Sequence, residues 1–597
     1  MQEIKERKDI DAKYKWHLED IFENDEAWET AFSDVRTRAE RFSEFKGKIG
    51  LCAKSLLGAI RELDEMGDLL LSVIVYACMR RDEDNTVSKY RAMSDRTGEL
   101  ESAVMSACSF FEPELIALGK EKVFEYMEEE SGLSIYRQFF ENLFREAEHV
   151  LDAESEKLLA MSSNMGDGAH DIFSAMNNAD MSFSKVEDKD GNLHELTHGR
   201  YGSFIESADR TLRKSAYDAM YEQYKKYKNT FAAMYSTNVK SDSFYAKARK
   251  YESSIAMKLS GSFIPESVYD NLIKDVNDGI SVLSDYLVLI KKSLGLDKLC
   301  MYDLYTPLVS DENEEIPYEE ACEMVLSAVA PLGEEYIKDM KRAFSEGWID
   351  VYENRGKTPG AYSWGDKTVH PYVLLNYQGK TEDVFTLAHE MGHAMHSYYT
   401  NKTQPSVYRD YKIFVAEVAS TVNENLLLEY LLKSATGKRR AYLLGRRLEA
   451  IRTTFYRQTM FAEFEKLAHA AYANGEALTA ESLCEMYGNL NKKYYGAVCE
   501  LDENISYEWA RIPHFYRSFY VYQYATGFAS ATKIKDLVIS SSDAAKKYME
   551  FLCGGSSKYP LELLKDAGVD LEKGDAARSV IADMAEALSE LKLLLDK

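Results

Sequence analysis

The chain has 597 residues, of which 45% are hydrophobic and 29% are charged, as is typical of a globular protein. Its 99 acidic residues outnumber 73 basic ones, which gives a net charge of −26. Such a charge repels nucleic acid and anionic membranes, because both are bound through Lys and Arg side chains that neutralise phosphate. We therefore expect no nucleic acid and no membrane among the partners.

Eight cysteines are scattered without a Cys-x-x-Cys pair, which favours reduced cysteines in an intracellular protein. The N-terminus is charged throughout and lacks the apolar core of a signal peptide. The longest apolar run, Leu69–Met79, is shorter than the roughly 20 residues that a membrane-spanning helix needs. The sequence therefore predicts a cytoplasmic protein.

The first part of the chain predicts consecutive amphipathic helices, because from Ala27–Glu156 apolar residues recur at spacings of three and four. Met181–Val186 then alternates at strand period, a turn signal follows, and Leu193–Thr197 alternates again, which predicts a β-hairpin. We place the boundary between two domains at this hairpin. The predicted domains are an N-terminal helical domain over residues 1–195 and a larger catalytic domain over residues 196–597.

Helical periodicity resumes over Thr211–Leu294. The apolar stretch Val369–Tyr377 predicts a strand, and Pro371 within it favours an edge strand, because proline cannot donate a hydrogen bond to a central ladder. After Thr381 the pattern is again helical, apart from an aromatic-rich stretch over Ser506–Phe528. We expect a mainly α fold with a small β-sheet or hairpin element.

The segment that begins at Thr381 predicts a helix with Thr381 as its N-cap. On this helix His389 and His393 are four residues apart and share one face, so both imidazoles can bind one ion at roughly 2.0–2.1 Å. Glu390 lies about 100° round the helix, where a carboxylate can take a proton from metal-bound water without being a ligand. This His-Glu-x-x-His pattern indicates a zinc peptidase with Glu390 as general base.

A catalytic zinc takes a third protein ligand and keeps one position open. Position 399 is Tyr, so the ligand is not a third histidine ten residues after the first. Glu417 follows His393 by 24 residues in an apolar segment where an unpaired carboxylate is costly, so it is our candidate, with a buried ion pair as the alternative. Glu424 suits an acceptor for a ligand histidine. His396 is expected beside the ligands, in a supporting, channel-lining or packing role.

Two other functions fit parts of this pattern. Glu-x-x-His pairs on helices can hold two irons in a bundle, and such pairs occur at Glu146–His149, Glu195–His198 and Glu390–His393. The second pair falls in the predicted hairpin, and two irons per chain would be needed to support this reading. A peptide-binding scaffold without activity is the other alternative, against which the intact His389, Glu390, His393 and Glu417 argue.

The residues named above and several others are similar to one known family. The chain resembles oligoendopeptidase F, within the thimet-oligopeptidase-like zinc metallopeptidases. The matching segments are His389–His396, Phe414–Thr421, Ile512–Tyr516, Phe519–Gly527, Trp16–Leu18 and Gly554–Asp570. The likeness extends over nearly the whole chain.

This resemblance implies a mostly helical, two-lobed fold with a deep channel that admits oligopeptides, cleaves them internally and excludes folded proteins. It implies one zinc ion per chain bound by His389, His393 and Glu417, with Glu390 as the base. It also implies that His514 and tyrosines after it steady the tetrahedral intermediate.

The choice of tyrosine is less direct, because in the mammalian-type relatives the first one comes five residues after the histidine, and position 519 here is Phe. We expect Tyr520 and Tyr524 to be the counterparts, with Tyr516 and Tyr522 as alternatives. A purely structural alternative is that these tyrosines belong to a tyrosine-rich core helix. A neutral donor aimed at the oxyanion contributes roughly 3–4 kcal/mol. A substrate peptide could also add as a strand to the predicted edge at Val369–Tyr377. An internal hairpin edge that does not contact substrate is an equally good interpretation of this stretch.

Overall fold

The structure, a computed structural model, describes residues 4–310 and 315–596. The chain divides into two compact units, and three separate segments build each of them. Unit 1 comprises Met1–Glu148, Asn313–Tyr430 and Ile534–Gly568, and unit 2 comprises His149–Glu312, Leu431–Lys533 and Val569–Lys597. These units follow spatial contacts, and the domain boundary after residue 195 stays a prediction.

Unit 1 contains helices and one three-stranded sheet. Its helices are α1 (Asp25–Phe42), α2 (Ala53–Glu83), α3 (Ser88–Cys108), α4 (Phe111–Leu118), α5 (Lys120–Glu129), α6 (Arg137–Glu146), α15 (Tyr318–Ala328), α16 (Glu334–Ser345), α17 (Thr381–Thr403), most of α18 (Ile413–Ser434), α23 (Ser542–Leu552) and α24 (Pro560–Asp566). Its strands are β4 (Ile349–Asp350), β5 (Tyr362–Trp364) and β6 (Tyr372–Leu374).

Unit 2 is also helical, with two small two-stranded sheets. Its helices are α7 (Ala153–Gly166), α8 (Gly168–Ala175), α9 (His198–Ile205), α10 (Arg210–Lys226), α11 (Lys228–Ala248), α12 (Ser254–Ser260), α13 (Glu266–Asp278), α14 (Ile280–Ser293), α19 (Gly437–Ala450), α20 (Arg457–Ala473), α21 (Ala480–Tyr494), most of α22 (Tyr522–Ser540) and α25 (Asp575–Leu595). Its strands are β1 (Val186–Glu187), β2 (Leu193–His194), β3 (Leu299–Cys300) and β7 (Cys499–Glu500).

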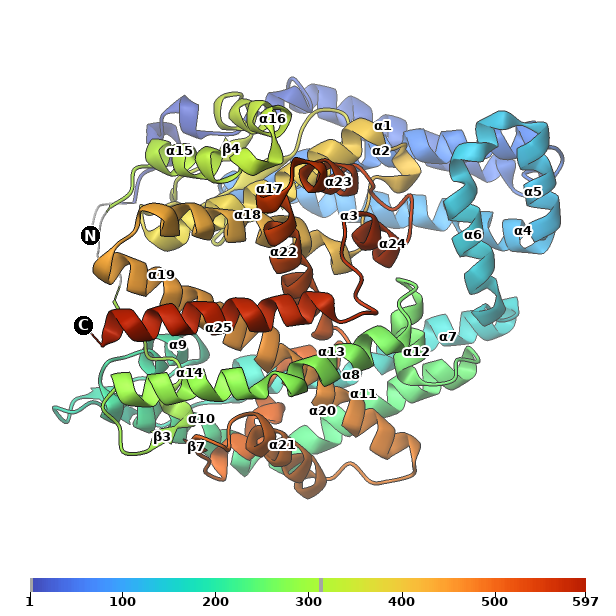
Figure 1. Ribbon diagram of the computed structural model, residues 1–597. Helices are drawn as coiled ribbons and strands as arrows, with labels where there is room; N and C mark the ends of the chain where they lie inside the picture. The colour runs from blue at the N-terminus through green and yellow to red at the C-terminus, as the bar shows by residue number, and fades with distance from the viewer. Residues whose placement is uncertain (1–3, 311–314, 597) are drawn as a thin grey trace. The chain divides into compact units, whose positions relative to one another are not determined.

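The mainly α fold is confirmed, because helices dominate both units (Figure 1). The predicted hairpin is present as the antiparallel pair β1 and β2, with Val186 opposite His194. The aromatic-rich stretch forms two short 3-10 segments, η12 (Asn504–Arg511) and η13 (Pro513–Tyr516), before α22 begins. None of the helices in the described ranges is both long and apolar enough to cross a bilayer.

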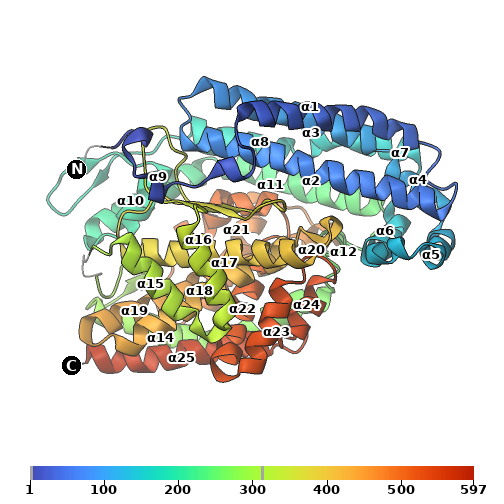
Figure 2. The ribbon, with the colours of Figure 1, turned by 90° about the horizontal axis from the view of Figure 1, so that it is seen from above.

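The first three helices of unit 1 run side by side (Figure 2) and share one hydrophobic core with α4, α5, α6 and β6. Each is amphipathic, and its apolar face is buried against the other two. Trp28 of α1 is fully buried, and its indole N–H donates to the carbonyl of Val73 in α2 at 2.8 Å. This bond gives the indole nitrogen the partner that a buried polar group needs.

The three-stranded sheet has the order β4-β6-β5, with β4 parallel and β5 antiparallel to β6. The prediction of an edge strand at Val369–Tyr377 is therefore wrong, because β6 is the central strand. Pro371 is compatible with this position because it lies just before the first residue of β6, and the ladder donors come later, as when Val373 N–H bonds the carbonyl of Trp348 at 2.9 Å. Both sides of β6 are occupied, so no substrate strand can add to it. Helix α17 contacts β5 and β6.

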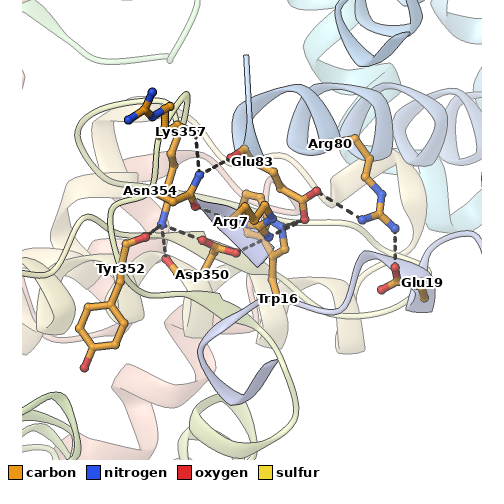
Figure 3. Close-up of polar contacts among 10 residues, drawn as sticks. Arg7, Trp16, Glu19, Arg80, Glu83, Asp350, Tyr352, Asn354 and Lys357 are labelled. Atoms are coloured by element: carbon orange, nitrogen blue, oxygen red, sulfur yellow. Dashed lines mark hydrogen bonds and ion pairs between the residues drawn. The ribbon is translucent and has the colours of Figure 1, made fainter. Parts of the chain in front are cut away.

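A buried ionic cluster joins the start of the chain to this sheet (Figure 3). Asp350 of β4 is only 2% exposed and binds the Arg7 guanidinium at 2.6 Å and the Lys357 ammonium at 2.7 Å. Glu83 of α2 accepts from Arg7 and from the indole of Trp16, each at 2.7 Å. Burial alone would raise the pKa of Asp350, but Lys357 and Arg7 outweigh burial and hold that pKa below its usual range.

Candidate metal centre

Helix α17 begins one residue earlier than an N-cap at Thr381 would require. Thr381 is its first helical residue, and Lys380 precedes it. The carboxylate of Asp383 reaches back and accepts the backbone N–H groups of Gln378 at 3.0 Å and Lys380 at 2.8 Å. Thr381 as N-cap is therefore wrong, because Asp383 supplies the acceptor from within the first turn.

The two histidines of α17 converge with the glutamate of α18. The Nε2 atoms of His389 and His393 each lie 3.6 Å from Oε2 of Glu417, and all three ligand atoms lie within 4.8 Å of one another. A separation of 3.6 Å is long for a hydrogen bond. It is close to the roughly 3.3–3.4 Å that separates two atoms bound to one tetrahedral ion at about 2.0–2.1 Å. Within residues 4–310 and 315–596, this is the one cluster of three His, Cys, Asp or Glu whose ligand atoms converge in this way.

Glu424 orients the first of these histidines. Its Oε1 accepts a hydrogen bond from Nδ1 of His389 at 2.6 Å, which leaves Nε2 free to face Glu417. Burial lowers the pKa of His389, but the bond and charge of Glu424 outweigh it and raise that pKa. Burial lowers the pKa of His393 to about 3, so this ring is neutral, as a metal ligand must be.

A glycine within the metal-binding motif allows α17 and α18 to approach closely. A Cβ added to Gly392 would lie 2.5 Å from the Cα of Ser420 and 2.7 Å from the carbonyl oxygen of Ala419. Asn423 of α18 ties the same pair of helices, because its side-chain amide donates to the carbonyl of Ala388 at 3.2 Å. Neither Gly392 nor Asn423 was predicted from the sequence. The sequence feature that indicates such a close approach is a glycine on one helix and small residues on the next.

Glu390 lies on the buried side of α17 and is 8% exposed. Burial raises the pKa of this carboxyl to about 7, with further contributions from the charges of Glu417 and Glu424. Glu390 is not part of the converging ligand set.

His396 is packed among aromatic rings. It is 1% exposed and stacks on Tyr411 with ring centroids 3.7 Å apart, and on Phe551 at 5.4 Å. Burial lowers its pKa to about 3, so the ring is neutral. These contacts agree with the packing role among the alternatives considered for it.

His514, Tyr520 and Tyr524 form one aromatic group in unit 2. The Tyr524 hydroxyl lies 3.5 Å from Nε2 of His514, and the rings of Tyr520 and Tyr524 meet edge to face at 5.5 Å. The two alternatives are placed differently: Tyr516 packs on Phe173 at 4.6 Å, and Tyr522 is 2% exposed. The metal-ligand candidates belong to unit 1, and a joint role of the two groups stays a prediction.

The turn before Tyr520 is held by a buried carboxyl group. Phe519 has a φ of 59°, a left-handed conformation that is costly for a residue with a bulky side chain. Its backbone N–H donates to Oε1 of Glu465 at 2.8 Å, and Glu465 is fully buried. Asn238 also bonds this segment, through the carbonyl of Phe515 at 3.3 Å and the hydroxyl of Ser518 at 3.0 Å. No sequence pattern points to Glu465, because its partner is a backbone group.

Comparisons with known proteins identify the family of the chain. The sequence pattern of peptidase family M3 matches residues 203–582, and that of oligopeptidase F matches residues 114–183. The chain belongs to peptidase family M3. Oligopeptidase PepF of Bacillus subtilis is 43% identical to this M3 peptidase over 100% of the present chain and 89% of its own length. Group B oligopeptidase PepB of Streptococcus agalactiae is 42% identical over 99% and 98% of the two chains.

Solved structures give the same assignment. The crystal structure of a protein described as a peptidase from Chlamydophila abortus has a TM-score of 0.94 and 34% identity, covering 99% of this chain and 100% of that one. Oligoendopeptidase-F from Enterococcus faecium has a TM-score of 0.73 and 36% identity, covering 96% and 99%. The protein is therefore an M3 metallopeptidase, an enzyme that hydrolyses peptides, and the family implies a metal for which the His389, His393 and Glu417 cluster is the fitting site.

Proposed function

We propose that this M3 peptidase is a zinc endopeptidase that cleaves internal bonds of short, unstructured oligopeptides. The observation that carries the proposal is the convergence of His389, His393 and Glu417 within 4.8 Å. Relatives above 40% identity carry the name oligopeptidase, which supports the substrate class.

Two imidazoles and one carboxylate are a donor set that suits one zinc ion and leaves a position open for water and substrate. The two-iron alternative has no support, because the Glu195–His198 pair lies at the hairpin and the start of α9 and does not join a second ligand cluster among the described residues. A zinc ion in this site supplies Lewis acidity, which polarises the scissile carbonyl and makes water a better nucleophile at neutral pH.

Glu390 is the proposed general base. It follows His389 directly on α17, so it lies beside the ligand set without belonging to it. It removes a proton from the attacking water and then delivers that proton to the amine that leaves when the peptide bond breaks. Its low exposure keeps bulk water away from the carboxylate during this transfer.

His514, Tyr520 and Tyr524 are the proposed donors to the oxyanion. Each can donate a hydrogen bond while neutral, and burial lowers the pKa of His514, which favours its neutral form. Donors fixed toward the developing charge stabilise the transition state more than the ground state. The mutual contacts of the three rings fix their orientation.

Metal analysis and peptide cleavage test the proposal together. The purified chain should contain one zinc per molecule and cleave an internally quenched peptide of about ten residues. Glu417→Gln should lose zinc and activity, whereas Glu485→Gln, at an exposed position of α21, should lose neither. Unchanged zinc affinity in Glu417→Gln would place the third ligand elsewhere. The cytoplasmic location stays a prediction.

A further inference from the structure

Unit 2 contains a cavity that the proposed peptidase mechanism does not use. It has a volume of about 240 Å³ and lies among α9, α10, η12 and the π-helical turn η11 (Ile451–Tyr456). Five tyrosines, three arginines and two glutamates line it, along with apolar side chains. Such a density of arginine and tyrosine is unusual for a cavity that only completes a core. A π-helical turn in the wall is also a feature that recurs at functional sites.

Two of the three arginines have their charge compensated within the protein. Arg457 binds Glu508 at 2.6 Å, and the same carboxylate accepts the hydroxyl of Tyr487 at 2.6 Å. Arg452 is 1% exposed, donates to Glu449 at 2.8 Å and lies over the ring of Tyr305 at 4.6 Å. Neither of these guanidinium groups needs an external anion.

Arg511 differs from both. Its guanidinium lies over the ring of Tyr201 at 5.0 Å and donates to the hydroxyl of Tyr221 at 3.5 Å. No carboxylate oxygen of the described residues lies within 4.0 Å of it, and Glu508 is already engaged with Arg457. Arg511 therefore shares the charge of Glu508 with Arg457 and has no ion pair of its own among the described residues. A partly buried guanidinium in this position at the wall of a cavity can bind an anion.

A second observation points to the same ligand. Tyr495 lines the cavity, is 1% exposed, and its hydroxyl has no hydrogen-bond partner in the described part of the chain. A buried hydroxyl is nearly always bonded, because its desolvation is otherwise uncompensated. Burial raises the pKa of this phenol above its ordinary range, so at physiological pH it offers a neutral O–H donor.

We propose that this cavity binds a carboxylate, held by the guanidinium of Arg511 and the hydroxyl of Tyr495 within tyrosine walls. A monoanion matches one guanidinium that has no direct ion pair, whereas a phosphate dianion would exceed its charge. Glu206 also lines the cavity and opposes an anion when ionised. Burial and the neighbouring Glu449 raise its pKa. The carboxylate can be the C-terminus of a peptide or a free small acid.

Direct binding tests the site without any need for catalysis. The probes are 4-fluorobenzoate and 4-fluorobenzamide, which have nearly the same shape and differ in charge, and binding to the full chain is followed by fluorine NMR. We expect the acid to bind at least about 10-fold more tightly than the amide, as a charge-assisted hydrogen bond would give. Arg511→Met should abolish this preference. Arg578→Met, which removes an exposed arginine of α25, should leave it unchanged.

Tyr495→Phe separates a binding role from a structural one. The substitution removes only a hydroxyl that has no hydrogen-bond partner among the described residues, so the thermal midpoint of the free chain should stay the same or rise. Affinity for 4-fluorobenzoate should nevertheless fall by about 5-fold or more. Equal affinity of acid and amide in the unaltered chain, no binding of either probe, or full affinity for the acid in both variants would overturn the proposal.

Hydrolysis identifies the source of the carboxylate, and this arm alone rests on the proposed peptidase function. Matched quenched peptides with a free or an amidated C-terminus are compared in KM. A lower KM for the free acid that disappears in Arg511→Met assigns the site to the peptide C-terminus. Equal KM values, with the binding preference intact, assign it to a free small acid. Absence of hydrolysis would count against the proposed function and leave the binding result to stand by itself.

Discussion

Gly392 determines how closely the two metal-binding helices pack. A methyl group at this position would meet the backbone of Ser420 at 2.5 Å, and backbone cannot move aside as a flexible side chain can. We expect Gly392→Ala to lower the free energy of unfolding by about 3 kcal/mol and to lower zinc content as well.

Chemical denaturation and metal analysis check this prediction. The matched control is Gly98→Ala in α3 of the same unit, where an added Cβ meets nothing within 4 Å. Alanine there should stabilise the chain by about 0.5–1 kcal/mol, because it is the better helix former. Equal effects of the two substitutions would show that α17 and α18 do not need a glycine contact.

Glu424 is expected to act on the metal through His389. Its carboxylate fixes the ring by a bond of 2.6 Å to Nδ1, so Glu424→Gln should weaken zinc binding by about 10–100-fold while the fold is kept. Competition with a chromophoric chelator measures the affinity. Zinc affinity equal to that of the unaltered chain would mean that the ring holds its orientation without this partner.

At the residue scale, much of the candidate site could be predicted from the sequence. Helical spacing brings His389 and His393 to one face whatever the tertiary fold, and the apolar surroundings of Glu417 mark a carboxylate that needs a cation. Gly392 and Glu465 could not be found in this way. Their roles depend on how closely two backbones approach, and on one N–H in a left-handed turn, which periodicity does not reveal.

Among the elements, the short sheet beside α17 depends on a buried charge. Asp350 of β4 compensates Arg7 and Lys357 in a place that is nearly inaccessible to water. Asp350→Asn removes the carboxylate that pairs with Lys357 and leaves Arg7 with Glu83 alone. The cost of breaking such a buried pair is about 3–5 kcal/mol.

Urea denaturation measures the decrease in the free energy of unfolding. Asp34→Asn breaks an exposed pair with Arg38 of the same helix at 3.2 Å and should cost about 0.5 kcal/mol or less. If Asp350→Asn lowered the free energy of unfolding no more than Asp34→Asn, the cluster would not stabilise the sheet. Because these partners hold the pKa of Asp350 low, its contribution is present above the pKa of the unfolded carboxyl and is lost as pH falls below it.

The turn that precedes Tyr520 should respond to Glu465. Glu465→Ala leaves the N–H of Phe519 without an acceptor and should destabilise the chain by about 1–3 kcal/mol. Glu465→Gln keeps an acceptor oxygen of the same shape and should stay within about 1 kcal/mol of the unaltered chain. Similar losses in both variants would show that the carboxyl group itself, not the bond to Phe519, is needed.

Sequence reasoning at the element scale succeeded where periodicity was strong and failed at Pro371. Proline within a central strand would remove a ladder donor, but Pro371 precedes the strand, where no ladder donor is required. The same limit applies to Thr381, where a residue two positions later supplies the cap acceptor.

For the whole molecule, metal binding should be coupled to stability. The candidate ligands come from α17 and α18, so an ion present at about 100 times its dissociation constant should stabilise the native chain by about 2.7 kcal/mol. A chelator should lower the thermal midpoint, and added zinc should restore it. The midpoint of Glu417→Gln should not respond to the chelator, and a full response there would contradict the ligand set.

The division into two units could not be read from the sequence. Each unit gathers three segments, and helices α18 and α22 each pass from one unit into the other without a break in periodicity. Hairpins and prolines punctuate a chain locally, whereas the units are defined by contacts between segments that are hundreds of residues apart.

The most direct test of the account is the zinc content and activity of Glu390→Gln. The amide keeps the size of the side chain and removes its capacity to accept a proton, while His389, His393 and Glu417 are untouched. We predict one zinc per chain and no detectable cleavage of a quenched decapeptide. Normal cleavage by a variant that retains its zinc would contradict Glu390 as the base.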